Sequence, residues 1–265
     1  SWVHQKEPEK ATAKAKDLVR MAVAKAAFIE PLHQVDLDLS KVALVVGGGV
    51  SGMNSALRLA DSGYPVHLVE KTGKLGGNAH YLLNTWKGEE IAPYLAELIK
   101  KVENHKGITL HMESEVTEAK GFVGNFTGRI TSQAGQDTNI DFGVVVMATG
   151  GHETQPSEYL YNQHEAVTTS LGFDGQLKAD PGLAKKLDSA AFIQCVGSRE
   201  PDHPYCSRLC CTHSVESAIK VKEENPDADV YILYRDIRTY GVREDLYSKA
   251  RELGVLFFRY DVDNK

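Results

Sequence analysis

The chain lacks several features that would mark other classes of protein. No run of about 18 consecutive apolar residues occurs among its 265 residues, which excludes a membrane-spanning helix of the usual length. The polar start, residues 1–7, shows no secretory signal pattern. Basic residues are not in excess, since 30 Lys and Arg against 36 Asp and Glu give a net charge of −6, which argues against a nucleic-acid partner. We therefore expect a cytoplasmic protein without a transmembrane segment.

Cysteine is scarce and is confined to one short segment. No cysteine precedes residue 195, and the four that are present are Cys195, Cys206, Cys210 and Cys211. A disulfide framework would normally spread its cysteines along a short secreted chain. The clustering therefore indicates metal binding or redox chemistry.

Two kinds of periodicity divide the chain. Residues 8–29 are rich in Ala and Lys and carry an apolar stripe at helical spacing, which predicts one helix. From residue 41 onward apolar strands alternate with helices, and only 152–189 is rich in loops. The elements predicted after the first helix are strands 42–46, 66–70, 109–112, 142–148, 191–196, 230–234 and 255–260, helices 52–62, 93–103, 214–224 and 242–252, and a β-meander over 122–133 with turns near Asn125 and Gly128.

This order of elements predicts an α/β fold, in which helical crossovers join the strands of parallel sheets. We expect three parts. Residues 1–40 would form a helical arm, residues 41–151 a Rossmann-like domain, and residues 152–265 a second lobe that carries the cysteines.

Gly47, Gly49 and Gly52 form the pattern G-x-G-x-x-G. The spacing alone is weak evidence, but here it follows an apolar strand and opens a helix, as a dinucleotide-binding motif must. The first glycine permits a tight turn, the second lets a pyrophosphate approach, and the third lets the helix pack on the strand. Glu70 lies 18 residues after Gly52 at the end of the next strand, where a carboxylate accepts hydrogen bonds from a ribose. A solvated Glu at a strand end is the less favoured alternative.

Three features favour FAD over NAD, and all three are resemblances to two-dinucleotide-binding flavoproteins. They are Gly76-Gly77 after Glu70, Ala148-Thr149-Gly150 at the end of a strand, and the meander between helix and strand. An ordinary turn explains Gly76-Gly77 equally well when it is taken alone. The predicted FAD contacts are Gly47, Gly49, Val50, Ser51, Gly52, Glu70, Lys71, Gly76, Gly77, Asn78, Val116, Ala148, Thr149 and Gly150.

The four cysteines are sufficient to hold one metal centre. Zinc ribbons use two separated Cys-x2–4-Cys pairs, so the adjacent Cys210-Cys211 favours an iron–sulfur cluster. Arg199 and Arg208 would offset the negative charge of the thiolates. The alternatives are a structural Cys195, a strained vicinal disulfide, and a catalytic disulfide like that of flavin disulfide reductases. We do not expect the last of these.

The cysteines stand where a nicotinamide-binding domain would carry a second glycine motif. Cys195 lies in the predicted strand 191–196, and the loop with the other three cysteines lies between this strand and the helix expected from Ser214. We interpret this lobe as a degenerate nucleotide domain and expect no nicotinamide cofactor to bind there. The charged loop with Asp236, Arg238 and Arg243 forms surface salt bridges or faces another protein of a complex.

Six blocks of the sequence resemble the A-type subunits of the heterodisulfide reductases and their bacterial relatives. The block around Cys206 and the block after it are far more specific than the glycine motif, and the similarity covers nearly the whole chain. The blocks are residues 1–4, 15–22, 45–53, 194–199, 205–211 and 231–241.

This resemblance implies an oxidoreductase with a thioredoxin-reductase-like core, FAD, and a 4Fe-4S cluster on the four cysteines. Electrons would pass between FAD and cluster toward disulfide or sulfur-metabolism partners, with other redox subunits and ferredoxin-like, hydrogenase or dehydrogenase partners. A scaffold lobe without a working cofactor is the alternative. Ferredoxin-type Cys-x2-Cys-x2-Cys repeats are absent, and the returning part of the FAD domain is expected after Lys265, so we expect this chain to be a fragment. No catalytic residue is predicted.

Overall fold

A computed structural model describes residues 5–31 and 36–261 of the chain. The chain divides into two compact units, Ser1–Asp38 and Leu39–Lys265. The first unit contains helix α1 (Pro8–Ala26), which confirms the predicted helix although it ends three residues early. Pro8 stands in the first turn, where a missing N–H costs nothing. None of the residues of α1 is buried.

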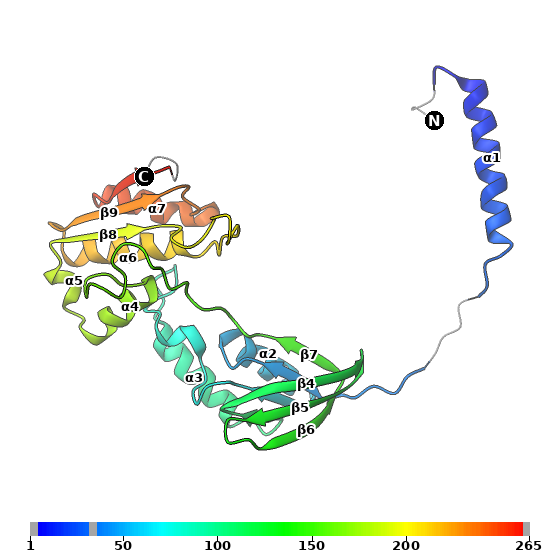
Figure 1. The fold of residues 1–265 in the computed structure, drawn as a ribbon, viewed down its shortest axis with the longest axis horizontal. Helices are drawn as coiled ribbons and strands as arrows, with labels where there is room; N and C mark the ends of the chain where they lie inside the picture. The colour runs from blue at the N-terminus through cyan, green and yellow to red at the C-terminus, as the bar shows by residue number, and fades with distance from the viewer. Residues whose placement is uncertain (1–4, 32–35, 262–265) are drawn as a thin grey trace. The chain divides into compact units, whose positions relative to one another are not determined.

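The second unit begins with a parallel sheet of four strands (Figure 1). The strand order is β3-β2-β1-β7, and every pairing in this sheet is parallel. Helices α2 and α3 pack on it, and Met53, Leu68 and Val102 lie fully buried between them and the sheet. The elements are β1 (Ala43–Val46), α2 (Val50–Asp61), β2 (Val66–Val69), η2 (Gly77–His80), α3 (Ile91–Glu103), β3 (Ile108–His111) and β7 (Val144–Met147). The predicted order of strands and helices is confirmed in this part.

An antiparallel meander of three strands, β4 (Ser114–Phe122), β5 (Asn125–Ser132) and β6 (Asp137–Phe142), packs beside the parallel sheet (Figure 1). Leu44 and Val69 of the parallel sheet share a buried cluster with Ile130, Ile140 and Phe142 of the meander.

The meander is longer than predicted, and one predicted turn is wrong. Gly128 lies in the middle of β5, where it pairs with Ala119 and Ile140. A Cβ on Gly128 would lie 2.9 Å from Cε1 of Phe142, so the glycine makes room for a buried ring and does not form a turn. The predicted strand 142–148 corresponds to β7, and only its first residue, Phe142, belongs to the preceding strand β6.

The rest of the second unit contains a parallel sheet of three strands in the order β10-β9-β8. Val215 of α6, Ile232 of β9 and Ala250 of α7 form its buried centre. The elements are α4 (Ser170–Ala179), α5 (Leu183–Lys186), β8 (Ser189–Ile193), α6 (Cys210–Glu224), β9 (Asp229–Tyr234), η3 (Gly241–Arg243), α7 (Glu244–Glu252) and β10 (Leu256–Arg259).

Two predictions fail in this part. The segment 152–189, predicted as loop, contains α4 and α5. Two glycines in α4 weaken its helical signal, because glycine disfavours a helix interior by about 1 kcal/mol, while Thr169 caps the helix by accepting a hydrogen bond from the N–H of Gly172 at 3.1 Å. Helix α6 begins at Cys210, four residues before the predicted start.

No helix among residues 5–31 and 36–261 is long and apolar enough to cross a membrane. This agrees with the absence of a long apolar run in the sequence.

The buried centre of the first sheet predicts a large effect of truncation. We expect Leu68→Ala to lower the free energy of unfolding by about 2–5 kcal/mol, because Leu68 is fully buried between the sheet and its helices. Val123→Ala, at a side chain that is 82% exposed in the meander turn, should change it by less than about 0.5 kcal/mol. Urea denaturation of both variants measures the difference, and equal losses would contradict this packing.

Candidate functional site

Two glycines at the turn between β1 and α2, Gly47 and Gly52, leave no room for a side chain. Gly47 has φ +107°, and a Cβ on it would lie 2.2 Å from the carbonyl oxygen of Ala148. A Cβ on Gly52 would lie 1.8 Å from the carbonyl oxygen of Gly47. The amide of Gly47 donates a hydrogen bond to the carbonyl of Val69 at 2.8 Å, which fixes the turn to β2.

Gly49 differs from its two neighbours in the motif. It has φ −71° at the N-cap of α2, and a Cβ on it would meet nothing within 4 Å. The helix has no side-chain cap, so the amides of its first turn, Val50 to Gly52, have no side-chain acceptor there. A helix N-terminus of this kind favours an anion through its dipole and its free N–H groups. The glycine turn therefore fits the pyrophosphate of a dinucleotide.

Glu70 is tied to the same turn. One of its carboxylate oxygens accepts a hydrogen bond from the amide of Gly48 at 2.7 Å. The other oxygen accepts from the amide and the hydroxyl of Thr72, each at 2.8 Å. A carboxylate has about four acceptor positions, so Glu70 keeps capacity for a ribose hydroxyl.

Gly76 and Gly77 close the other side of the turn. The amide of Gly76 donates to the carbonyl of Gly48 at 2.8 Å, and Gly76 pairs with Gly49 in an isolated parallel bridge. Gly76 has φ +114°, and a Cβ on it would lie 2.6 Å from Nε2 of His80. These contacts explain the glycine pair better than an ordinary turn does.

The end of β7 joins the same group. The amide of Ala148 donates to the carbonyl of Val46 at 2.8 Å. Asn78 Nδ2 donates to the carbonyl of Gly151 at 2.9 Å, which holds the segment after Thr149 and Gly150 near η2. The structure thus brings together most of the residues that the sequence predicts as FAD contacts.

Two of the predicted FAD residues lie differently. Lys71 forms an exposed ion pair with Glu115, with 2.7 Å between Nζ and the carboxylate oxygen. The side chain of Val116 packs against the buried cluster of the meander. The contacts given for these two side chains are therefore with the meander and not with the glycine turn.

The four cysteines lie at the end of β8 and the start of α6. Cys195 follows β8 with φ +62°, and Cys206 precedes the helix, where its Sγ accepts a hydrogen bond from the amide of Arg208 at 3.3 Å. Cys210 and Cys211 are the first residues of α6. The sequence pattern instead predicts them in the loop before this helix. All four are free thiols, and Cys211 is buried.

The thiols of Cys195, Cys210 and Cys211 act on one another electrostatically. A hydrogen bond from Cys211 lowers the pKa of the Cys210 thiol, and the same bond together with burial raises the pKa of Cys211. Burial also raises the pKa of Cys195, although a hydrogen bond from Arg199 opposes the shift.

Within the described parts of the chain, no three side chains of His, Cys, Asp or Glu are close enough to hold a metal ion. Four thiols are nevertheless the donor set that iron–sulfur clusters use, and three of them already interact. The donors fit a cluster by their chemistry.

The spacing of the cysteines requires one correction. Cys206 and Cys211 have the Cys-x4-Cys spacing that flavin disulfide reductases use, so the sequence alone does not exclude a redox disulfide between them. In the structure both cysteines are free thiols, and the Sγ of Cys211 lies 3.7 Å from the carbonyl oxygen of Asp236.

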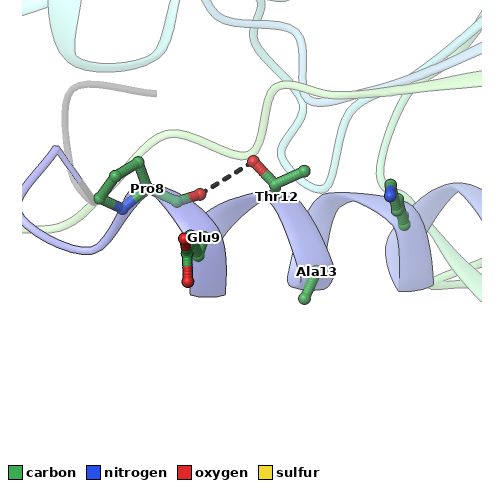
Figure 2. A pocket seen from close by; sticks show the side chains of 5 residues that line it. Pro8, Glu9, Thr12 and Ala13 are labelled. Carbon is green, nitrogen blue, oxygen red and sulfur yellow. Dashed lines mark hydrogen bonds between the residues drawn. The ribbon is translucent and has the colours of Figure 1, made fainter.

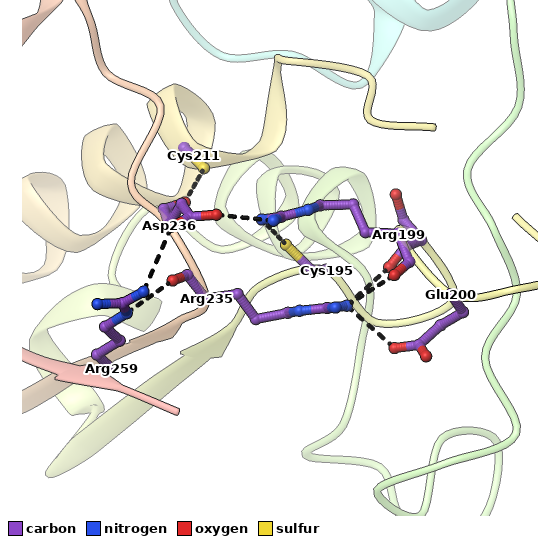
Figure 3. Close-up of polar contacts among 8 residues, drawn as sticks. Cys195, Arg199, Glu200, Cys211, Arg235, Asp236 and Arg259 are labelled. Atoms are coloured by element: carbon purple, nitrogen blue, oxygen red, sulfur yellow. Dashed lines mark hydrogen bonds and ion pairs between the residues drawn. The ribbon is translucent and has the colours of Figure 1, made fainter. Parts of the chain in front are cut away.

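A network of arginines and carboxylates lies beside Cys195 and Cys211 (Figure 3). Arg199 lies 2.7 Å from a carboxylate oxygen of Asp236 through Nη2, and its Nη1 donates to the Sγ of Cys195 at 3.9 Å. Arg235 Nη1 lies 3.1 Å from a carboxylate oxygen of Glu200 and also donates to the carbonyl of Arg199 at 3.0 Å. The prediction that Arg199 lies close to the thiols agrees with this geometry, whereas Glu200 and Arg235 were not predicted from the sequence.

A second polar cluster was missed because α4 was not predicted. His213 Nε2 lies 3.0 Å from a carboxylate oxygen of Asp174, which also accepts from the amide of Leu83 at 3.3 Å. Burial disfavours the charged imidazole, but the bond to Asp174 and the nearby carboxylates outweigh it, and the pKa of His213 is raised. Burial raises the pKa of Glu216 to about 7. The pair of Asp174 and His213 could not be predicted from residue spacing, because only tertiary packing brings α4 against α6.

A shallow depression on α1 is lined by Pro8, Glu9, Thr12, Ala13 and Lys16 (Figure 2). All five residues belong to one exposed helix, and the Thr12 hydroxyl donates to the carbonyl of Pro8 at 2.8 Å. A ligand there would stay exposed to solvent, so we assign no site to it.

Comparisons with known proteins agree with this geometry. The profile of the family "Pyridine nucleotide-disulphide oxidoreductase" matches residues 41–182. The second A-type iron–sulfur subunit of the CoB–CoM heterodisulfide reductase of Methanopyrus kandleri is 31% identical over 351 aligned positions, covering 98% of this chain and 54% of that protein. The A-type subunit of the H(2):CoB-CoM heterodisulfide,ferredoxin reductase of Methanothermobacter thermautotrophicus is 30% identical, and the match covers 98% of this chain and 53% of that protein.

The chain therefore spans about half the length of the curated relatives it matches. The similarity to the A-type subunits of heterodisulfide reductases that the sequence blocks indicated is confirmed. Residues 1–4, the first of those blocks, lie outside the described residues.

Solved structures show the same fold. The thioredoxin reductase of T. acidophilum aligns with a TM-score of 0.54 and 15% identity over 82% of this chain and 63% of its own. The flavoprotein disulfide reductase RclA of Escherichia coli aligns with a TM-score of 0.50 and 15% identity over 82% of this chain and 48% of its own. The predicted thioredoxin-reductase-like α/β fold is thus confirmed.

The raised pKa of Glu216 predicts a pH-dependent stability. The folded protein binds this proton more tightly than the unfolded chain, so the carboxyl stabilises the fold below the unfolded pKa of about 4.3, and this contribution is lost as pH rises through about 7. We expect Glu216→Gln to gain about 1–3 kcal/mol relative to the parent between pH 5 and pH 8. His213, Asp174 and Arg243 also act on the carboxyl.

Urea denaturation at several pH values measures this gain. The control is Glu252→Gln, at an exposed carboxyl near the end of α7, which should follow the parent at every pH. A Glu216→Gln curve that runs parallel to the parent would contradict the assignment.

Proposed function

Because the chain belongs to the pyridine nucleotide-disulphide oxidoreductase family, we propose that it is a flavin- and iron–sulfur-dependent electron-transfer protein that resembles the A-type subunits of heterodisulfide reductases. The observation that carries the proposal is the glycine turn, in which Gly47 and Gly52 are closed to any side chain while Gly49 is open. An open position between two closed ones is what a pyrophosphate needs to approach the helix N-terminus.

We assign FAD to this turn. The amides at the start of α2 would bind the pyrophosphate, and Glu70 would accept hydrogen bonds from the ribose. Asn78 holds the chain at Gly151 and thereby positions the segment from Ala148 to Gly150 beside the glycine pair. When bound, FAD supplies both two-electron and one-electron transfer.

We assign a 4Fe-4S cluster to Cys195, Cys206, Cys210 and Cys211. Cys210 and Cys211 begin helix α6, Cys195 lies in the turn two residues after β8, and Cys206 comes from the loop between them. Arg199 lies against the Sγ of Cys195 and would offset the negative charge of the thiolates. A cluster supplies a one-electron centre next to a flavin.

We propose a division of labour within the second unit. Residues 41–151 would hold FAD, residues 152–265 would hold the cluster, and residues 1–40 would form a separate arm. By similarity to relatives whose names include heterodisulfide and ferredoxin, the electrons would pass toward a disulfide or a sulfur-metabolism partner. Other redox subunits, ferredoxin-like carriers and hydrogenase or dehydrogenase partners would complete the complex in the cytoplasm.

One observation favours a second candidate, a scaffold lobe that docks redox subunits without holding a cluster. Within residues 5–31 and 36–261 no group of three metal-ligating side chains is close enough for an ion. The two candidates differ in iron content, which is directly measurable.

Gly49→Ala separates flavin binding from folding. Its φ of −71° and the open space around it let alanine adopt the same backbone, so thermal stability should stay within a few degrees of the parent. The added methyl group would occupy the approach of the pyrophosphate, and we expect FAD affinity to fall at least about tenfold, which is about 1.4 kcal/mol. Fluorescence titration with FAD measures the affinity. Gly175→Ala, in α4 and with equally open space around it, is the control far from the motif.

Unchanged FAD affinity in a folded Gly49→Ala protein would contradict the assigned site. A variant that fails to fold would show instead that the backbone at Gly49 differs from the structure.

Cys206→Ser tests the cluster at the cysteine that lies in the loop before α6. If Cys206 is a ligand, the variant reconstituted anaerobically with iron and sulfide should hold less than half of the parent's iron, which we expect to be about four per chain. Ser62→Ala, at an exposed serine that follows α2 outside the cysteine segment, should keep the parent's content. Equal iron in the parent and in Cys206→Ser would remove Cys206 from the ligand set, and no iron in the parent would favour the scaffold.

A further inference from the structure

The loop that carries Cys206 exposes side chains of the type found at protein interfaces. Tyr205 and Leu209 are each 66% exposed, although both side chains are large and mostly apolar. Arg208 lies between them, is exposed, and forms no ion pair with any residue that the structure describes. Tyrosine and arginine are enriched where proteins bind one another, and arginine binds carboxylates through its planar fork.

A second loop is held beside the same helix end. The thiol of Cys211 donates to the carbonyl of Asp236, and the backbone of Arg238 also hydrogen bonds to this thiol. Two residues farther along, Tyr240 is 61% exposed. An exposed aromatic ring from each loop thus lies near the start of α6.

The two loops and the strand ends beside them also carry charged side chains. The chain as a whole carries −6, whereas residues 199–211, residues 235–245 and Arg259 together hold six arginines, at positions 199, 208, 235, 238, 243 and 259, against five carboxylates, at positions 200, 202, 236, 244 and 245. Arg199 and Arg235 are occupied by close ion pairs with Asp236 and Glu200 (Figure 3). Arg259 donates through Nε to the carbonyl of Arg235 at 3.2 Å and lies 3.8 Å from Asp236 through Nη2, but its side chain is 73% exposed, so it stays accessible, as Arg208 does.

We propose that Tyr205, Arg208, Leu209, Tyr240 and Arg259 form a docking surface, here called the cysteine-edge surface, for the acidic face of a protein electron carrier. The proposal rests on the proposed function, because an electron would leave most readily where the thiols come nearest to solvent. The accessible arginines would attract the carboxylates of the carrier, and Tyr205 with Leu209 would form the dry centre of the contact.

The test measures association of the full chain with a purified acidic two-cluster ferredoxin by biolayer interferometry. Binding should weaken as ionic strength rises from about 20 to 200 mM, because screening reduces the attraction between charged faces. Arg208→Glu and Arg259→Glu should each weaken binding about tenfold at low salt. Arg58→Glu makes the same charge change on the exposed end of α2 and should bind as the parent does.

The apolar part of the surface has its own variants. Tyr205→Ala with Leu209→Ser should weaken binding about tenfold while leaving the salt dependence unchanged. Tyr64→Ala, at a tyrosine that is 44% exposed outside this surface, is the control. Cytochrome c, a basic carrier of similar size, should not bind.

The outcomes separate this inference from the function on which it rests. Flavin and iron are measured in every variant, so a lost cofactor is not mistaken for a lost surface. Salt-dependent binding that needs Arg208 and Arg259 in a protein without iron would support the surface and refute the proposed function. Absence of ferredoxin binding, binding that both reversals leave unchanged, or equal binding of cytochrome c would overturn the surface.

Discussion

The close approach of three backbone segments at the glycine turn is the constraint on which the first part of the structure depends. The carbonyl of Gly47 occupies the space of a Cβ on Gly52, and the carbonyl of Ala148 occupies the space of a Cβ on Gly47. The helix start, the end of β1 and the end of β7 are thereby drawn together, and Glu70 and Gly76 are hydrogen bonded to Gly48 between them. A binding surface for a dinucleotide is a direct consequence, because the one open glycine then lies at a helix N-terminus.

The same parallel strand–helix plan recurs in the second lobe with different chemistry at the turn. Where the first lobe has glycines before α2, the second has a loop ending in the cysteine pair that starts α6. Arg199 contacts both Asp236 and the Sγ of Cys195, and Cys195 has a left-handed conformation that is unusual for a residue with a side chain. If thiols replaced phosphate contacts at this position, as we propose, the two redox centres would lie at equivalent ends of the two parallel sheets.

The sequence predicted those features that depend on local pattern. The strand–glycine–helix order around Gly47 and the type and order of most elements follow from periodicity and turn residues. Gly128 was misread as a turn because its real role is to admit the ring of Phe142, a contact made between β5 and β6. Helix α4 was missed because two glycines mask it, and with it the Asp174–His213 pair, which exists only after α4 packs on α6. The ion pair of Arg235 with Glu200 joins residues on different elements, and no local pattern marks it.

The central claim is that one chain holds both a flavin and an iron–sulfur cluster that exchange electrons. An anaerobic redox titration of the purified, reconstituted protein tests it most directly, with flavin followed by visible absorbance and the cluster by electron paramagnetic resonance in the same samples. The account predicts bleaching of flavin bands together with a cluster signal that appears on reduction and is abolished when the cysteines are replaced. Flavin bands without any cluster signal, or neither after reconstitution with both, would contradict it.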